Sequence, residues 1–345
     1  MINLKSVKEL RKTYSLFQTL SAINGPDIGQ GLLDRVIYNS EALPPLGKEY
    51  WWFLFLGKNG EKPVQFLLMI CRKYGGKIWI DDKEMILQRI NNNQFKAGVT
   101  AWVSDESKIH NLGDTNALVK IKGNQISAEL SGEKLTFEGR FPDYRLKIGN
   151  SIDLKIKKSE LISKRDKEAY GLFAPPIGAG WINLYPDVEG TILSKEFKGT
   201  GHLQKVVGVI PHFPYNWLRV IFENGSMARF SCIKPGRESK IYLQKGANFY
   251  DNKSGQLIDF NGPEIRITKT NDSLFWTFEG KDADKSMKIA LEVYAKKQFV
   301  LRGHGSLTYI EHCFVPKEFL FKTKTQTITL NDLGKGVGTL EDAYW

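Results

Sequence analysis

The stretch Tyr50–Gly60, Tyr-Trp-Trp-Phe-Leu-Phe-Leu-Gly-Lys-Asn-Gly, decides how this chain folds. It is an apolar run of strand length that ends at an Asn-Gly pair, and such a pair between apolar segments is a strong hairpin signal. Residues 63–71 continue as a second apolar run. The two runs therefore predict a β-hairpin.

The same pattern returns in the second half of the chain. Tyr215–Trp217 precede Asn224-Gly225 at the spacing with which Tyr50–Trp52 precede Asn59-Gly60. Two further echoes follow in the same order: residues 77–79 with 240–242, and residues 136–139 with 277–280. Echoes in one order along strand-like stretches predict an internal duplication of a β-unit.

Length and composition agree with two domains. The 345 residues suit about two domains of ordinary size. The hydrophobic share of 41% and the charged share of 25% are typical of globular proteins. We predict a lead-in with a short helix over 1–47, a first barrel over 48–165 and a second barrel over 166–345.

Short alternating segments fill both halves. Between residues 119 and 156, apolar and polar residues alternate in segments separated by glycine-containing turns, which indicates an antiparallel meander in a barrel or sandwich. Residues 81–96 fit either a short helix or irregular structure. The chain ends with a polar strand over 325–330 and a glycine-rich tail over 334–345. No glycine-rich loop joins a strand to a helix, so a Rossmann or P-loop enzyme is excluded.

Residues 4–20 predict an amphipathic helix, because apolar residues recur at steps of three and four with basic residues on the other side. Such a helix packs on its own domain or lies on a membrane surface. Gly25-Pro26 ends it.

The net charge of +11 permits contact with nucleic acid or an anionic membrane. The basic residues are spread along the chain without a dense block, so nucleic acid is not the expected partner. Cys71, Cys232 and Cys313 are far apart and suit a reducing compartment. Met1–Leu20 is too polar for a secretory signal. We expect a cytoplasmic protein with, at most, peripheral membrane contact.

The sequence contains no clear motif for a metal site or a catalytic triad. None of the five histidines forms an HxH or HExxH motif, and no two cysteines are close in sequence. A G-x-S-x-G motif is absent. We expect neither a metal nor a cofactor.

The segment 178–225 is the most distinctive. Polar and apolar residues alternate there, so some polar side chains are expected inside a barrel. A small barrel can hold one ligand, and a pocket lined with Trp and Tyr suits a hydrophobic molecule with one polar end.

Four short motifs carry a family resemblance. Glu49–Trp52 is similar to a Glu-Trp-Trp motif, Gly199–His202 resembles Gly-x-Gly-Tyr, Asn216–Arg219 resembles a Trp-Gly-Arg strand, and Gly336–Glu341 resembles Gly-x-Gly-x-x-Glu. In this order they resemble the double-lipocalin family of carotenoid 1,2-hydratase (hydroxyneurosporene synthase) and AttH-like proteins. Tocopherol cyclase and lipocalin-like Diels–Alderases are more distant members.

The resemblance implies two tandem lipocalin-like barrels and a cofactor-independent enzyme, a hydro-lyase or cyclase. Its substrate would be a hydrophobic isoprenoid or polyene that is hydrated, cyclised or isomerised. The chain departs from the hydratases at Gln204, where they carry Asp. An amide cannot replace a carboxylic acid as proton donor. Other acids are available for that role: Asp187, Glu189, Glu223, Glu311 and Glu341.

We predict that His202, Gln204 and Glu341 are catalytic. The expected substrate contacts are Trp181, Tyr185, Trp217, Arg219 and Trp276. For the acid, the histidine and the tryptophans an ordinary structural alternative stays open: a solvated carboxylate or turn cap, a hydrogen-bonded histidine or a core tryptophan. Arg219 could instead cross the end of a barrel as a cation–π cap. Two other functions also stay open: a non-catalytic binding or carrier protein for a hydrophobic small molecule, and a peripheral membrane adaptor.

Overall fold

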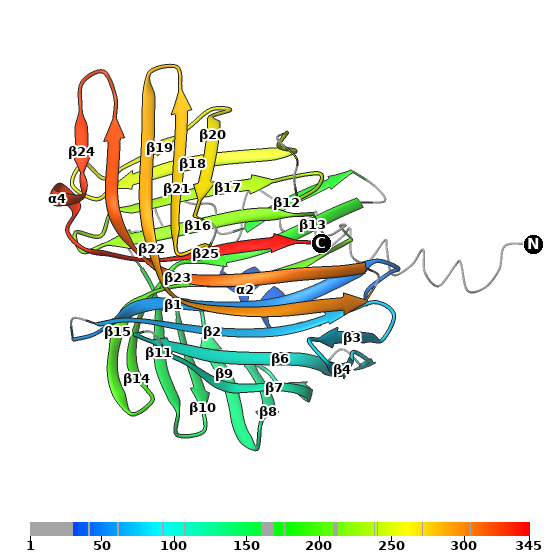
Figure 1. Ribbon diagram of the computed structural model, residues 1–345. Coiled ribbons are helices and arrows are strands. Elements are labelled where there is room, and N and C mark those ends of the chain that lie inside the picture. Colours follow the sequence, from blue (N-terminus) through cyan, green and yellow to red (C-terminus); the bar gives the residue numbers. More distant parts are fainter. Residues whose placement is uncertain are drawn as a thin grey trace, which may run out of the picture. The chain divides into compact units, whose positions relative to one another are not determined.

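The protein is seen in a computed structural model that is almost entirely β-strand (Figure 1), which confirms the predicted fold class. It describes residues 30–40, 42–60, 62–91, 93–106, 108–159, 169–174, 177–209, 213–237, 239, 241–270, 272–303 and 305–345. The helix predicted over residues 4–20 lies outside this range. Within it, no helix has the length and apolar character needed to cross a membrane.

The chain forms two compact units. Residues 1–105 and 110–211 make up the first, and residues 106–109 and 212–345 make up the second. The predicted boundary at 165/166 falls in the segment 160–168, outside the described residues. The strands that follow it, β13 (Ile177–Leu184), β14 (Pro186–Ile192) and β15 (Lys195–Val209), hydrogen-bond to strands of the first unit. The first unit therefore extends further along the chain than predicted, because β15 completes its sheet.

The described strands of the first unit include a closed antiparallel ring of ten. In ring order these are β1 (Gly47–Asn59), β2 (Lys62–Lys73), β6 (Gln94–Asp105), β7 (Lys108–Ile121), β8 (Gln125–Leu130), β9 (Glu133–Arg140), β10 (Asp143–Ile148), β11 (Ile152–Lys158), β14 and β15. The ring closes where β1 pairs with β15, from Gly47↔Val209 to Lys58↔Lys198. The predicted first hairpin is β1–β2.

Three short strands lie in or just before the segment 81–96, whose structure the sequence left open. They are β3 (Lys77–Ile80), β4 (Lys83–Ile86) and β5 (Arg89–Asn91). β3 pairs with β4, and β5 pairs with β6. Residues 81–96 are therefore strands and turns rather than a helix. A further strand, β12 (Ala169–Ala174), pairs with β13 outside the ring.

Apolar side chains fill the first barrel. Successive side chains of a strand point to opposite faces, so Trp51, Phe53 and Phe55 of β1 all point inward. Trp51 stacks on Phe95, and Phe53 lies edge-on to Phe137. A packed apolar core therefore fills the part of the barrel that these side chains occupy.

The short helix α2 (Gln30–Ile37) joins this core. Leu33, Val36 and Ile37 belong to the same buried cluster as the barrel side chains. The indole Nε1 of Trp51 donates a hydrogen bond to the Ile37 carbonyl oxygen at 2.8 Å. The carboxylate of Asp34 accepts another from the Tyr144 hydroxyl, also at 2.8 Å. Both bonds hold the helix against the barrel strands.

A buried ion cluster ties three barrel strands together. Glu49 on β1 accepts from the Arg72 guanidinium on β2 at 2.5 Å and from the Lys205 ammonium on β15 at 2.6 Å. The Lys205 ammonium also lies 3.3 Å from the centre of the Trp51 ring and donates to the Asn39 carbonyl oxygen at 2.7 Å. The cluster thus links β1 to both neighbours and to the chain after α2.

Removing the carboxylate should leave two buried cations next to each other. We expect Glu49→Gln to lower the free energy of unfolding by about 3–5 kcal/mol, as for other broken buried ion pairs. The matched control is Glu84→Gln, which breaks the exposed pair of Glu84 with Lys77. It should change stability by no more than about 1 kcal/mol. Urea denaturation of both variants measures the difference, and equal losses would contradict this role for Glu49.

Glycines allow β15 to approach β1 closely. Gly57 and Gly199 face each other in the ladder. A Cβ atom on Gly199 would overlap the carbonyl oxygen of Leu56, and one on Gly201 would lie 2.5 Å from the Phe55 ring. The glycines at 199 and 201 are therefore explained by the close packing of β15 against β1.

Adding one methyl group to this contact should force the two strands apart. We expect Gly199→Ala to destabilise the first unit by about 1–3 kcal/mol, as overpacking does. Gly236→Ala adds the same methyl group where no atom lies within 4 Å. The Gly236→Ala change should alter the free energy of unfolding by no more than about 0.5 kcal/mol. Thermal unfolding compares the two, and a neutral Gly199→Ala variant would overturn the close-approach explanation.

The second unit repeats the design of the first. Its meander runs through β16 (Tyr215–Phe222), β17 (Met227–Ile233), β18 (Gln244–Asp251), β19 (Gln256–Asp259), β20 (Glu264–Lys269), β21 (Phe275–Asp282), β22 (Lys285–Gly303), β23 (Gly305–Lys322) and β25 (Gly336–Tyr344). The short β24 (Thr327–Thr329) and α4 (Leu330–Leu333) precede the last strand. β16 pairs with β25, as β1 pairs with β15. The first strand thus meets a late strand of its own unit in both copies.

Two of the predicted features differ in the structure. The glycine-rich tail is strand β25, which lies between β16 and β23. Its glycines permit this, because a Cβ on Gly338 would overlap the Phe314 ring. The echo between residues 77–79 and 240–242 has no structural counterpart: the first forms β3, whereas Ile241 and Tyr242 lie in a loop.

The second sheet curls around one core of its own. Phe230 on β17 lies 5.6 Å from Phe278 on β21, although four strands separate β17 from β21 in the order of the sheet. Phe249 on β18 likewise lies 4.9 Å from Phe321 on β23. Within the described residues, no ladder joins the edge strands β19 and β20. The curled sheet therefore closes through side-chain packing.

Candidate functional site

His202 and Gln204 lie on the outer face of the first barrel. Their neighbour Leu203 belongs to the barrel core, and strand alternation turns His202 and Gln204 the other way. The side-chain oxygen of Asn183 accepts from His202 Nε2 at 2.9 Å and from Gln204 Nε2 at 2.8 Å. Because an amide oxygen only accepts, His202 carries a proton on Nε2.

Two aromatic residues that were predicted to contact substrate lie near His202 and Gln204. The Tyr185 ring stacks on the His202 ring at 5.0 Å. Trp181 lies two residues before Asn183 on β13, so both are on the same face of that strand. The structure therefore brings together four predicted residues, Trp181, Tyr185, His202 and Gln204, around Asn183, which the sequence did not single out.

A second part of the predicted set lies in the second unit. Glu341 on β25 has Trp217 of β16 as its cross-strand partner on one side. Leu218 and Leu340 point into the apolar core, so Trp217, Arg219 and Glu341 point to the opposite face. Arg219 is buried, and its Nε lies 3.1 Å from the Met227 sulfur.

Trp276 does not share that face. It lies in the core of the second unit, stacked on Phe278 and 5.5 Å from the His312 ring. Burial and the nearby Lys296 and Lys269 lower the pKa of His312 to about 3, so this histidine is neutral at physiological pH. Trp276 therefore packs in the core on the face of the sheet away from Glu341.

The most unusual electrostatic feature is a carboxyl pair formed by Glu311 and Glu341. The two residues are directly opposite on β23 and β25, and the Cβ atoms of such partners are about 5 Å apart. Glu311 accepts from the Tyr309 hydroxyl at 2.5 Å and from the Thr339 hydroxyl. Glu341 accepts from the Tyr215 hydroxyl at 2.7 Å. Three adjacent strands thus supply every group of this cluster.

The surroundings favour different protonation states for the two carboxyls. Burial, reinforced by the charge of Glu311, raises the pKa of Glu341 well above its ordinary value, although the Tyr215 and Tyr309 hydroxyls act in the opposite direction. Burial and the charge of Glu311 also raise the pKa of Tyr309, which keeps its hydroxyl as a donor. Two carboxyl groups this close disfavour double ionisation, and the raised pKa of Glu341 favours its protonated form.

Sequence reasoning named Glu311 only as one acid among several and missed three of its neighbours: Tyr215, Tyr309 and Thr339. A signal was present, because Tyr309-x-Glu311 and Thr339-x-Glu341 place polar residues at alternate positions of apolar strands. Only the register, which sets Glu311 beside Glu341, turns these alternations into one cluster.

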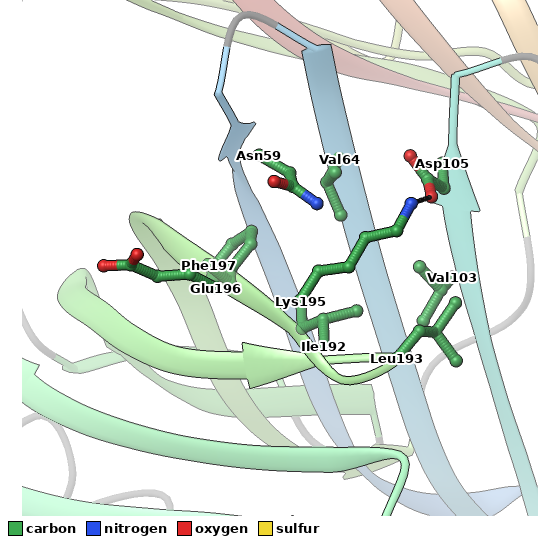
Figure 2. Close-up of a pocket in the computed structure, with 9 residues that line it drawn as sticks. All are labelled: Asn59, Val64, Val103, Asp105, Ile192, Leu193, Lys195, Glu196 and Phe197. Carbon is green, nitrogen blue, oxygen red and sulfur yellow. Dashed lines mark hydrogen bonds and ion pairs between the residues drawn. The ribbon is translucent and has the colours of Figure 1, made fainter.

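A separate small pocket lies against the first barrel (Figure 2), lined by Asn59, Val64, Val103, Asp105, Ile192, Leu193, Lys195, Glu196 and Phe197. Lys195 reaches across it to Asp105 at 2.7 Å. Its other walls are mostly apolar, and none of the predicted site residues belongs to it. Across the described ranges, no three His, Cys, Asp or Glu side chains are grouped as a metal site.

Comparison with known proteins gives similarities of fold alone. No family model matches the chain, and no curated protein matches it. Similar solved structures include an AttH-type protein from Nitrosomonas europaea, with 13% identity, a TM-score of 0.44, and 85% of this chain and 92% of that one covered. Kievitone hydratase from Nectria haematococca has 12% identity and a TM-score of 0.45 over 86% and 89% of the two chains.

A third similar structure is CghA, with 12% identity and a TM-score of 0.48 over 88% of this chain and 90% of that one. A structure of CghA with Sch210972 has 14% identity and a TM-score of 0.46 over the same shares of the two chains. An AttH-type protein and a hydratase are thus among the structures that resemble this chain in fold.

The raised pKa of Glu341 should appear as a pH-dependent stability. At a pH above about 4.3, an unfolded glutamate is ionised, whereas folded Glu341 stays protonated. The unfolded state therefore binds fewer protons, and the wild type loses stability as pH rises, by about 1.4 kcal/mol per pH unit for one proton. The glutamine of Glu341→Gln cannot titrate. The stability of this variant relative to the wild type should therefore increase between about pH 5 and pH 8.

Thermal unfolding at both pH values measures this gain. The exposed Glu189→Gln change is the matched control and should shift Tm equally at the two pH values. Parallel pH profiles for the wild type and Glu341→Gln would show that Glu341 is ionised in the folded protein.

Proposed function

We propose that the protein is an enzyme that protonates a hydrophobic isoprenoid or polyene, with Glu341 as the acid. The observation that supports this most directly is the carboxyl pair, in which Glu341 lies directly opposite Glu311 and has a pKa raised well above its ordinary value. A carboxylic acid that stays neutral at pH 7 can act as a general acid. The proposal moves the donor from Gln204, which cannot supply a proton, to a residue of the second unit.

The proposed step transfers the Glu341 proton to one carbon of a double bond and leaves a cation on the other carbon. Water can then add to the cation and return a proton to the carboxylate, which completes a hydration. Attack by a second double bond, followed by loss of a proton, gives a cyclisation, and loss of a neighbouring proton gives an isomerisation. Each route restores Glu341 and consumes no cofactor.

Aromatic groups beside the pair suit a cationic intermediate. Trp217 is the cross-strand partner of Glu341, and the Tyr215 and Tyr309 hydroxyls bond to the two carboxyls. Aromatic faces attract cations, most strongly when water is excluded. In this proposal Trp217 stabilises the developing positive charge, and the tyrosines hold the carboxyl groups in place.

The cluster on the first unit has a different proposed role. His202 Nε2 and Gln204 Nε2 are both engaged by Asn183, which fixes the orientation of the two side chains. Fixed polar groups with the Tyr185 ring beside them suit binding of a polar group on a ligand better than proton transfer. We therefore assign His202 and Gln204 to binding.

The experiment that tests this function uses deuterium. The protein is incubated in D2O with polyenes, isoprenoid alcohols and prenyl-quinols, and the products are examined by mass spectrometry. Protonation of a double bond introduces deuterium on carbon, so the wild type should yield a labelled product. Glu341→Gln should lower its rate by about 100-fold or more, the usual contribution of a general acid.

Glu189→Gln is the matched control, because it makes the same chemical change on an exposed strand position. Its labelling rate should equal that of the wild type. Tight binding of these compounds without any labelled product would favour a carrier protein. Full activity of Glu341→Gln would remove Glu341 from the proposed mechanism.

A further inference from the structure

Four of the ten large hydrophobic side chains that the described residues expose lie at one end of the second unit. They are Phe213, Ile241, Leu243 and Trp345. Ile241 is 72% exposed and Leu243 is 55% exposed, and Ile241 is the most exposed of the ten. Soluble proteins seldom gather exposed apolar side chains in one place without an interaction that uses them.

Backbone and ring contacts show that these residues form one surface. The start of β16 meets the end of β17, because Lys234 N donates to the Pro214 carbonyl oxygen at 2.8 Å. Leu243 N donates to the Ile233 carbonyl oxygen at the same distance. The Phe213 ring lies 6.3 Å from the Trp345 ring at the end of β25. We call Phe213, Ile241, Leu243 and Trp345 the end patch.

The loop that carries Ile241 and Leu243 is anchored. Tyr242, between them, packs against the core of the second unit. The Ser239 hydroxyl donates to the Ile241 carbonyl oxygen at 3.1 Å and accepts from the Ile241 amide at the same distance. The two aliphatic side chains on either side of Tyr242 are therefore held at the surface.

Basic side chains surround the end patch. The Arg237 guanidinium lies 3.9 Å from the centre of the Tyr344 ring, and the Lys234 ammonium lies 5.8 Å from that of Tyr242. Lys245 is exposed on the strand that follows the loop. Three basic side chains that the structure describes, Lys234, Arg237 and Lys245, therefore border the end patch.

We infer that the end patch docks on an anionic lipid surface. Aliphatic side chains flanked by Trp, Tyr and basic residues match the layers of a membrane interface, with aliphatic groups below the headgroups and rings and cations among them. The positive charge complements anionic headgroups. This surface does not include residues 4–20, for which the sequence predicts a helix, and the inference does not depend on the proposed enzymatic activity.

Co-sedimentation of the full chain with lipid vesicles tests the inference. The wild type should bind phosphatidylcholine vesicles that contain phosphatidylglycerol and should lose this binding as salt concentration rises. The double change Ile241→Ser with Leu243→Ser should lower the partition coefficient about tenfold or more, because two inserted aliphatic side chains are lost. Arg237→Glu should lower it about fivefold or more.

The matched control is the double change Leu274→Ser with Phe275→Ser. These side chains belong to the same unit and are 42% and 47% exposed, but they lie at the turn between β20 and β21. The control should bind vesicles like the wild type. Thermal unfolding of each variant identifies any loss that comes from misfolding.

Three outcomes would overturn the inference. The wild type could fail to bind anionic vesicles, or the Ile241/Leu243 variant could bind as tightly as the wild type. Light scattering could instead show that the wild type is a dimer and that this variant is a monomer, which would assign the end patch to self-association.

Discussion

The buried carboxylate of Glu49 is the interaction on which the first unit depends. It lies on β1 and bonds to cations on both neighbouring strands, Arg72 of β2 and Lys205 of β15. The β1–β15 ladder is the contact that closes the ring, so the ion cluster lies at the closure. Burying three charged groups is unfavourable unless each is paired, which penalises any register that separates them. The cluster therefore favours one closed arrangement of these strands.

The two units treat buried carboxyl groups in opposite ways. Glu49 is paired with two cations, Arg72 and Lys205, so its negative charge is stabilised, and the Lys205 ammonium also lies over the Trp51 ring. Glu341 lies opposite another carboxyl group, and burial together with that neighbouring charge raises its pKa. The same residue type is thus a structural anion in one unit and a carboxyl group with a raised pKa in the other. The chemical difference comes from the partners alone.

Strand alternation separates structural from functional roles along single strands. On β15, the side chains of Leu203 and Lys205 point to the barrel interior, whereas those of His202 and Gln204 point to the outer face. On β25, Leu340 enters the core while Glu341 turns away from it. The same strands therefore carry apolar side chains on the core face and polar groups on the other face.

Local signals were enough to predict the all-β class, the hairpins at residues 50–71 and 215–233, and the duplication, because turn residues and alternating apolar positions can be read directly from the sequence. It also supplied the family resemblance and the candidates His202, Gln204 and Glu341. Only the tertiary structure decided that β15 belongs to the first unit and that residues 336–344 form a strand beside β16. It alone set Glu311 opposite Glu341 and joined Lys205 to Glu49. These are contacts between residues far apart in the chain, and they depend on strand register, which no local pattern specifies.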